Sequence, residues 1–167
     1  MDPPAGALLL LDLRTPADRV ALRPIDDVVM GGRSRSDVLP CEDGAAFEGV
    51  VSLEDGGGFA SVRSVPRGWD MRGREALLVR CRGDGRRYKL NLRDEATFDG
   101  VTHQAPFEPA RAWATLRLSL AGFAPRLRGR PTAAPPLDLA RVETVGFLVS
   151  DRQAGPFRLE VAWVAAI

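Results

Sequence analysis

The stretch that most constrains the fold of this chain is an alternating run broken by Gly-Asp-Gly. Leu77–Leu92 reads LLVRCRGDGRRYKLNL, and apolar and polar residues alternate on both sides of Asp84-Gly85. Alternation with a period of two is typical of a half-buried β-strand, and an Asp-Gly pair between two such runs is typical of a hairpin turn. The sequence therefore predicts two antiparallel strands joined at Asp84-Gly85.

The register of this predicted hairpin assigns its side chains to two faces. Apolar pairs share one face: Cys81 with Tyr88, Val79 with Leu90, and Leu77 with Leu92. Like charges share the other face: Arg82 with Arg87, and Arg80 with Lys89. Like charges directly opposite each other are destabilising by roughly 0.2–1 kcal/mol per pair. We therefore expect either that carboxylates on adjacent strands neutralise this face or that it meets an acidic partner.

The remaining segments predict an all-β chain of about nine strands. Pro16 and Pro24 limit any helix between them to one or two turns, and Glu54–Gly57 indicates a second hairpin turn. In the last strand we expect Phe157, Leu159, Val161 and Trp163 to share the core face. Short strands with turn signals between them favour an antiparallel sandwich or barrel. The strands expected outside the central hairpin are Ala7–Leu13, Ala46–Leu53, Gly58–Val65, Val101–Phe107, Trp113–Leu120, Val142–Ser150 and Pro156–Val164.

Length and composition narrow the class of protein. With 167 residues the chain is expected to form a single domain, residues 1–167. A formal net charge of +1 argues against broad binding of nucleic acid or membrane surfaces. Cys41 and Cys81 make no disulfide framework, and Cys81 is expected to be a buried thiol. No signal peptide, transit peptide or apolar run of about 18 residues is seen, so we expect a soluble protein of a reducing compartment.

The sequence offers little support for catalysis. His103 is the one histidine, and no C-x-x-C, H-x-x-x-H or G-x-S-x-G spacing accompanies it. The glycine clusters do not form a phosphate-binding loop. We therefore expect no enzyme activity, no catalytic residue, no cofactor and no metal site. Trp113 lies on the polar side of its strand and is the better candidate for stacking on a sugar, whereas Trp163 is expected in the core.

Four motifs follow one another along the chain: Asp27–Ser36 (DVVMGGRSRS), Gly58–Arg63 (GFASVR), Gly83–Leu90 (GDGRRYKL) and Val145–Val161 (VGFLVSDRQAGPFRLEV). In this order they resemble the complex I intermediate-associated protein 30 family. The resemblance implies a galactose-binding-domain-like β-sandwich of jelly-roll type, in agreement with the predicted strands. It further implies that mitochondrial members assist assembly of respiratory NADH:ubiquinone oxidoreductase, and that the fold is related to carbohydrate-binding modules. For this chain we expect a bacterial, cytoplasmic relative.

The leading functional hypothesis is a non-catalytic protein-binding or assembly module whose partner is another protein. The alternative is a carbohydrate-binding module that uses the same sheet face, with acidic glycans favoured over neutral ones because the face is rich in arginine. Neither hypothesis involves nucleic acid or insertion into a membrane. The candidate contact residues are Asp27, Met30, Gly31, Gly32, Arg33, Ser34, Arg63, Arg80, Arg82, Lys89, Asn91, Gln104 and Trp113.

Overall fold

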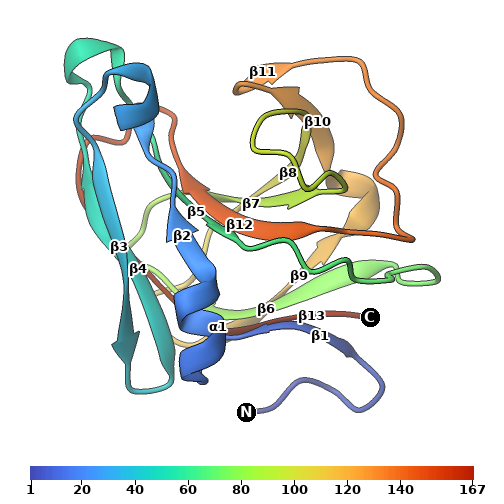
Figure 1. The fold of residues 1–167 in the computed structure, drawn as a ribbon. Helices are drawn as coiled ribbons and strands as arrows, with labels where there is room; N and C mark the ends of the chain where they lie inside the picture. The colour runs from blue at the N-terminus through green and yellow to red at the C-terminus, as the bar shows by residue number, and fades with distance from the viewer.

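The computed structural model, which describes residues 1–167, is a sandwich of two antiparallel sheets with little helix (Figure 1). The first sheet has the order β3-β4-β13-β6-β9, with β1 also paired to β13. Its strands are β1 (Leu8–Asp12), β3 (Arg35–Cys41), β4 (Gly44–Val51), β6 (Ala76–Arg82), β9 (Ala114–Ser119) and β13 (Gly155–Ala166). The second sheet has the order β11-β10-β8-β7-β12-β5-β2. Its strands are β2 (Leu22–Pro24), β5 (Ala60–Ser64), β7 (Tyr88–Arg93), β8 (Thr102–Phe107), β10 (Ala124–Leu127), β11 (Arg130–Pro131) and β12 (Thr144–Val149).

Helical structure is confined to short connections. The helix α1 (Pro16–Ala21) begins after Thr15, whose side chain accepts a hydrogen bond from the Asp18 N–H, and it has proline in its first turn. It carries the chain from β1 in the first sheet to β2 in the second and covers one open side of the sandwich (Figure 1). The 3₁₀ turns are η1 (Asp27–Met30), η2 (Glu54–Gly56) and η3 (Leu120–Gly122).

The core lies between the two sheets and contains the residues that the alternation predicted. Cys81 belongs to this cluster as a free thiol, and burial raises its pKa to about 12. The expectation of a buried thiol is therefore confirmed. The residues of the central stretch that are at most 1% exposed are Leu77, Val79, Cys81, Tyr88, Leu90 and Leu92.

The predicted hairpin at Asp84-Gly85 is wrong, because β6 and β7 lie in different sheets. β6 pairs with β13 and β9, whereas β7 pairs with β8 and β12. The Gly-Asp-Gly segment instead carries the chain from one sheet to the other. The Asp84 carboxylate fixes this crossing by accepting hydrogen bonds from the Tyr88 hydroxyl (3.0 Å) and the Arg158 backbone N–H (2.8 Å). The expected like-charge pairs of Arg82 with Arg87 and of Arg80 with Lys89 do not form.

A second predicted hairpin, at Glu54–Gly57, is also wrong. This segment forms η2 and joins β4 in the first sheet to β5 in the second, so the two strands do not pair. The sandwich has thirteen strands, where about nine were predicted. The additional strands are β2, β3, β10 and β11. Three of them lie at sheet edges, and all four contain proline (Pro24, Pro40, Pro125 and Pro131), which edge strands tolerate because one side of their backbone has no partner.

Trp163 does not share the core face of β13, contrary to expectation. The register of β13 against β6 shifts between Val161 and Trp163, and this bulge reverses the alternation. Phe157, Leu159 and Val161 point into the main core, whereas Trp163 packs in a small separate cluster with Ala162 and Ala165. Trp163 therefore lies on the outer side of the first sheet.

Candidate functional site

The outer face of the second sheet carries a continuous row of residues across six strands. Strand registers place each member directly opposite the next, so the row follows from backbone pairing alone. Figure 1 shows the edges of this sheet, η1 on one side and β10–β11 on the other, rising above its middle strands. From β2 to β10 the row reads Arg23, Arg63, Gly146, Asn91, Gln104 and Ala124.

The middle of this row is neutral. The Gln104 Nε2 donates a hydrogen bond to the Asn91 Oδ1 (2.9 Å). Gly146 leaves the centre bare, because a Cβ there would collide with the carbonyl oxygen of Val62 on β5. Beside the row, the Lys89 ammonium pairs with Asp151 at 2.9 Å, so its charge is compensated. The structure therefore brings four predicted contact residues to this face: Arg63, Lys89, Asn91 and Gln104.

One end of this face holds a hollow of about 230 Å³ whose arginines have no carboxylate within ion-pair distance. Three arginines line the hollow, Arg23, Arg63 and Arg93, and no acidic residue does. The Arg63 Nη1 donates to the carbonyl of Phe98 (2.8 Å), and its guanidinium lies over the Phe98 ring at 5.6 Å. Burial, together with the nearby charge of Arg93, lowers the pKa of Arg63 to about 10. We call this hollow the three-arginine pocket.

The Asp27–Ser34 loop forms a rim at one edge of the second sheet, and its inner half is structural. Asp27 is 1% exposed, and its carboxylate accepts hydrogen bonds from the backbone N–H groups of Ser34 (2.8 Å), Gly58 (2.7 Å) and Phe59 (3.2 Å) and from the Ser34 hydroxyl (2.5 Å). Burial would raise the pKa of Asp27, but these hydrogen bonds stabilise the carboxylate and hold its pKa below the usual value. A Cβ on Gly32 would collide with this side chain. Asp27, Gly32 and Ser34 thus tie two loops together and have little surface to offer a partner.

The outer half of the same loop is exposed and apolar. Met30 is 66% exposed, and its neighbours Val28 and Val29 are exposed to a similar degree. Gly31 ends η1 in the left-handed conformation, with φ of 86°. Arg33 is exposed and pairs with Asp55 at 2.5 Å. The rim therefore presents three apolar side chains and a neutralised arginine to solvent.

Arg80, Arg82 and Trp113 lie on the opposite side of the molecule from the other predicted contact residues. They belong to the outer face of the first sheet, because β6 and β9 are strands of that sheet. Both guanidinium groups lie over the Trp113 ring, at 5.9 Å for Arg80 and 5.3 Å for Arg82. Arg82 also pairs with Glu160, whose pKa the Arg82 hydrogen bond lowers. The predicted single polar face is therefore wrong, and it divides into two.

Groups with catalytic potential are not gathered on either face. His103 is 4% exposed, and burial lowers its pKa and so favours the neutral imidazole. No three or more His, Cys, Asp and Glu side chains are grouped so that they could hold a metal ion. No helix of the chain has the length and apolar character needed to cross a membrane.

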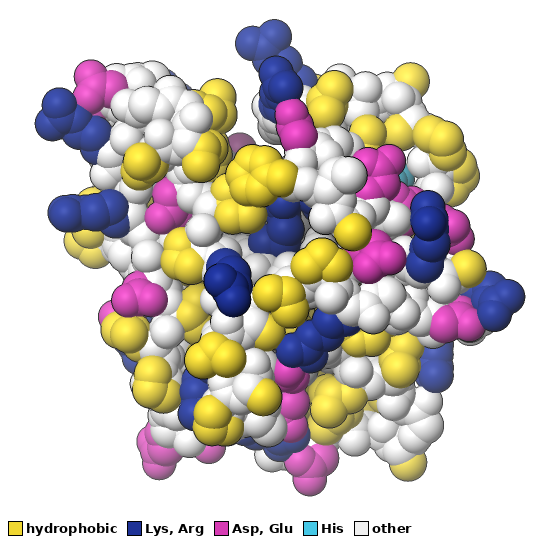
Figure 2. Space-filling model, in the orientation of Figure 1, with side chains coloured by type: hydrophobic (Ala, Val, Ile, Leu, Met, Phe, Trp, Pro, Cys, Tyr) yellow, Lys and Arg dark blue, Asp and Glu magenta, His cyan; other side chains and the backbone are white.

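The sequence predictions missed two residues of the three-arginine pocket. Arg93 continues the alternation of Lys89 and Asn91 along β7, so extending the predicted strand by one residue would have found it. Arg23 reaches the pocket because β2 pairs with β5, and no local pattern in the sequence indicates that pairing. Figure 2, in the orientation of Figure 1, shows hydrophobic, basic and acidic side chains interspersed over this side of the molecule.

Solved structures of the same architecture define the class of the fold. A family 11 carbohydrate-binding module from Clostridium thermocellum, in complex with a β-1,3-1,4-mixed-linked tetrasaccharide, superposes with a TM-score of 0.71 at 14% identity, covering 99% of this chain and 97% of the module. The family 11 module of the cellulosomal cellulase Lic26A-Cel5E of the same organism gives 0.70 at 13% identity, covering 98% of this chain and 95% of that one. The protein belongs to the class of jelly-roll β-sandwiches and shares the fold of these two modules.

Within this class, the chain belongs to the complex I intermediate-associated protein 30 (CIA30) family, whose model matches residues 11–161. The mitochondrial complex I intermediate-associated protein 30 of Mus musculus is 29% identical over an alignment 161 residues long, and the match covers 83% of this chain and 49% of the mouse protein. The chain thus spans about half the length of this curated relative. The family resemblance and the fold class expected from the sequence are both confirmed.

Proposed function

We propose that this chain is a non-catalytic protein-binding module that assists assembly of a multisubunit complex, and that it contacts its client through the outer face of the second sheet. The observation that carries the proposal is the combination, on this one face, of arginines without acidic partners and an exposed apolar rim. Arginine and large apolar side chains are enriched in protein–protein interfaces, where arginine often contributes most of the binding free energy.

Family membership supports one candidate for the client. The mouse relative is named for its association with a complex I intermediate, so we take respiratory NADH:ubiquinone oxidoreductase, or a subassembly of it, as the candidate client. We place the activity in a reducing compartment, the bacterial cytoplasm, in keeping with the two free thiols Cys41 and Cys81. The client would then be met before or during its attachment to the membrane.

The test compares two charge-matched double variants as bait in a detergent extract of bacterial respiratory membranes. Arg23→Glu/Arg63→Glu alters the second sheet's outer face, and Arg35→Glu/Arg80→Glu makes the same charge change on the first sheet. None of these four arginines has a carboxylate within ion-pair distance, so both doubles are expected to stay folded, which thermal unfolding checks.

We expect the wild type and the first-sheet variant to enrich subunits of NADH:ubiquinone oxidoreductase, measured by quantitative mass spectrometry, and the second-sheet variant to lose about tenfold or more of that enrichment. Equal enrichment by the two variants would remove the second sheet as the contact surface. If the wild type enriched no subunit of the complex above bait-free resin, the assembly role itself would be refuted.

A second candidate function is glycan binding, which the solved module in complex with a tetrasaccharide favours. The aromatic side chain of the three-arginine pocket is Phe98, which is 64% exposed, while Trp113 is held under two arginines on the opposite face. A thermal shift assay with the mixed-linked tetrasaccharide and with acidic oligosaccharides tests this function. A rise in melting temperature that Phe98→Ala abolishes would support it, and no shift with any sugar would eliminate it.

A further inference from the structure

The three-arginine pocket differs from the other charged places on the chain because its positive groups face one another. Arg23 on β2 lies directly opposite Arg63 on β5. Like charges directly opposite each other on neighbouring strands are destabilising. The sequence predicted such a contact between β6 and β7, where none forms; it forms here, between β2 and β5. The residues that line the pocket include no aspartate or glutamate.

Arg93 makes the imbalance larger, since its guanidinium is enclosed. Arg93 is 1% exposed, and its Nη1 donates to the carbonyl oxygen of Thr97 (2.5 Å). Its Nε and Nη2 are buried and have no hydrogen-bond partner. The carboxylates of Asp94, Glu95 and Asp99 influence Arg93 only from beyond ion-pair distance. An enclosed charge with two unsatisfied donors is costly, and a neighbouring anion would reduce that cost.

We propose that the three-arginine pocket binds one carboxylate, carried by a Glu or Asp side chain in an acidic segment of the client protein. Arg23 is exposed and Arg63 is half-buried, so these two supply the N–H groups that contact the carboxylate, while Arg93 behind them supplies positive charge. Guanidinium groups bind carboxylates with paired, charge-assisted hydrogen bonds. This inference rests on the proposed function, because it names the chemistry that the same face recognises in a client.

The size and setting of the pocket favour a single side chain over a larger ligand. Its volume of about 230 Å³ lies below the roughly 300–1,000 Å³ of pockets that enclose small organic ligands. Phe98 and Ile25 line it together with the arginines, so an acidic residue with an apolar neighbour would find contacts for both. Elsewhere on this face Lys89 is paired with Asp151 and the Asn91–Gln104 pair is neutral, while Arg126 lies on β10, near the opposite edge of the sheet.

The experiment follows the arginine Nε–Hε signals by NMR during titration of the full chain at constant ionic strength. The probes are N-acetyl-glutamate N-methylamide, its glutamine counterpart and inorganic phosphate. We expect saturable shifts of the Arg63 and Arg93 signals with the glutamate probe and no saturable shift with the glutamine probe. Shifts of all arginines alike, or saturation with phosphate alone, would overturn the assignment of a carboxylate.

Two charge-matched variants locate the site. Arg63→Gln should weaken binding of the glutamate probe about tenfold or more, because it removes a contacting guanidinium. Arg126→Gln removes the same charge from β10, near the other edge of the same sheet, and should leave binding unchanged. Arg63 is substituted in preference to Arg93 because Arg93 is enclosed and its loss endangers the fold. Equal affinity in the two variants would refute the pocket.

This titration separates failure of the inference from failure of the proposed function, because it needs no client. If the probe does not bind and Arg23→Glu/Arg63→Glu still loses the client, the contact surface stands and the carboxylate is wrong. If the probe binds and no client subunit is enriched by the wild type, the pocket stands and the assembly role is wrong.

Discussion

The two outer faces of the sandwich handle positive charge in opposite ways. On the first sheet Glu160, which is 6% exposed, pairs with both Arg82 and Arg158, and Arg158 also pairs with Glu48. On the second sheet Arg23, Arg63 and Arg93 gather without a carboxylate partner. The same residue type therefore stabilises one face internally and remains available for external contacts on the other.

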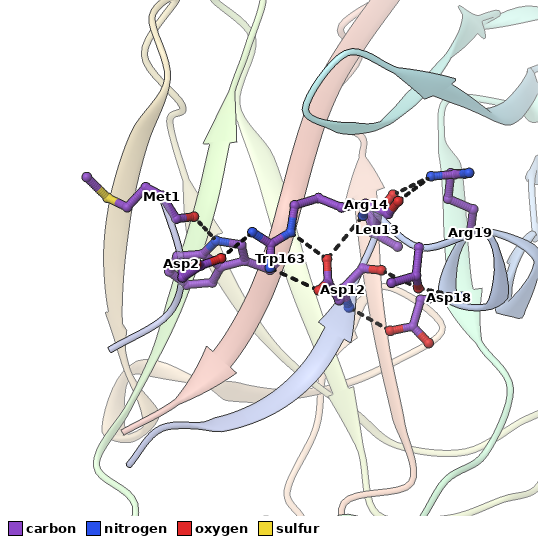
Figure 3. A network of polar contacts seen from close by, with 9 residues as sticks. Met1, Asp2, Asp12, Leu13, Arg14, Asp18, Arg19 and Trp163 are labelled. Atoms are coloured by element: carbon purple, nitrogen blue, oxygen red, sulfur yellow. Dashed lines mark hydrogen bonds and ion pairs between the residues drawn. The ribbon is translucent and has the colours of Figure 1, made fainter. Parts of the chain in front are cut away.

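The apolar part of the first sheet's outer face around Trp163 is covered by the N-terminal residues. The Trp163 indole donates a hydrogen bond to the carbonyl oxygen of Met1 (2.9 Å), and the Arg74 Nη1 donates to the carbonyl of Gly6 (2.8 Å), so residues 1–6 lie across this part of the sheet (Figure 3). A hollow of about 690 Å³ along β3, β4 and β13 is lined by charges of both signs. Its size alone would make it the leading site, but Arg158 already pairs with Glu48 there, and acidic side chains line the hollow together with Arg35.

The comparison shows that neither hollow size nor the number of arginines identifies the contact surface. The Glu160 cluster of the first sheet differs from the three-arginine pocket because its arginines have a carboxylate partner within the fold, and a paired charge gains little from an added ligand. Substitutions that test this difference are expected to change the free energy of unfolding by amounts that range from about 3 kcal/mol to less than about 0.5 kcal/mol.

The largest effect is expected at the rim of the second sheet. Asp27→Asn replaces a carboxylate that accepts from four donors by an amide that brings two donors of its own, so about 3 kcal/mol of unfolding free energy should be lost. Urea unfolding measures it. Asp26→Asn is the neighbouring control, since burial raises the pKa of Asp26 and the neutral form is tolerated there. Equal losses in the two variants would mean that no rigid rim supports the open face.

The contribution of the Asp27 carboxylate to the free energy of unfolding should decrease as the pH falls into the acidic range. The folded-state pKa of Asp27 lies below its unfolded value of about 3.9, so its stabilisation is fully present above that value and is lost as the pH falls through the folded-state pKa. The stability difference between wild type and Asp27→Asn should therefore be constant from pH 7 to about 5 and shrink below about pH 4. A difference that grew on acidification would contradict the assignment.

The paired face should lose stability when its central carboxylate is removed. The Glu160 side chain is nearly buried, and Glu160→Gln removes the carboxylate that Arg82 and Arg158 share. We expect a loss of about 2 kcal/mol in the free energy of unfolding. Glu48→Gln is the control, because Glu48 pairs with Arg158 alone and is more exposed; we expect at most about 0.5 kcal/mol. Both losses of unfolding free energy are measured by urea unfolding. If Glu160→Gln cost no more than its control, the first face would not be internally stabilised.

The sequence predicted which residues are buried better than which strands are neighbours. Leu77, Val79 and Leu90 are inward as the alternation required, because a period of two determines the face of a residue whatever strand lies beside it. The Asp84-Gly85 turn was read as a hairpin, yet the same residues serve a crossing between sheets. Long-range contacts distinguish the two outcomes, such as that of Asp84 with the Arg158 backbone N–H, 74 positions away, and no local pattern encodes them.

The candidate site was predicted in part for the same reason. Lys89, Asn91 and Gln104 share a face because they alternate on β7 and β8, which are adjacent. Arg80 was assigned to that face by the wrong hairpin, and Trp163 was assigned to the core because a bulge cannot be read from periodicity. The pairing of strands that are far apart in the sequence, such as β2 with β5, determines which arginines lie next to each other.

Removing the cover of the first sheet should have a smaller effect. Deletion of residues 1–6 frees the Trp163 N–H and exposes one side of its ring, at a cost of about 1 kcal/mol. In a Trp69→Phe/Trp113→Phe background the fluorescence of Trp163 should shift to longer wavelength. Unchanged emission would show that the segment does not shield this face.

The smallest change in the free energy of unfolding is expected when one charge is removed from the three-arginine pocket. Arg63→Gln removes a guanidinium whose partner is a backbone carbonyl and relieves its repulsion with Arg23 and Arg93, so the free energy of unfolding should change by less than about 0.5 kcal/mol in either direction. Arg82→Gln removes the same charge from the first sheet and should destabilise the protein measurably more, because Glu160 loses a partner. Parallel urea titrations of the two variants compare the faces directly. A larger loss for Arg63→Gln would mean that the arginines of the second sheet hold the fold together, and they could then not be offered to a client.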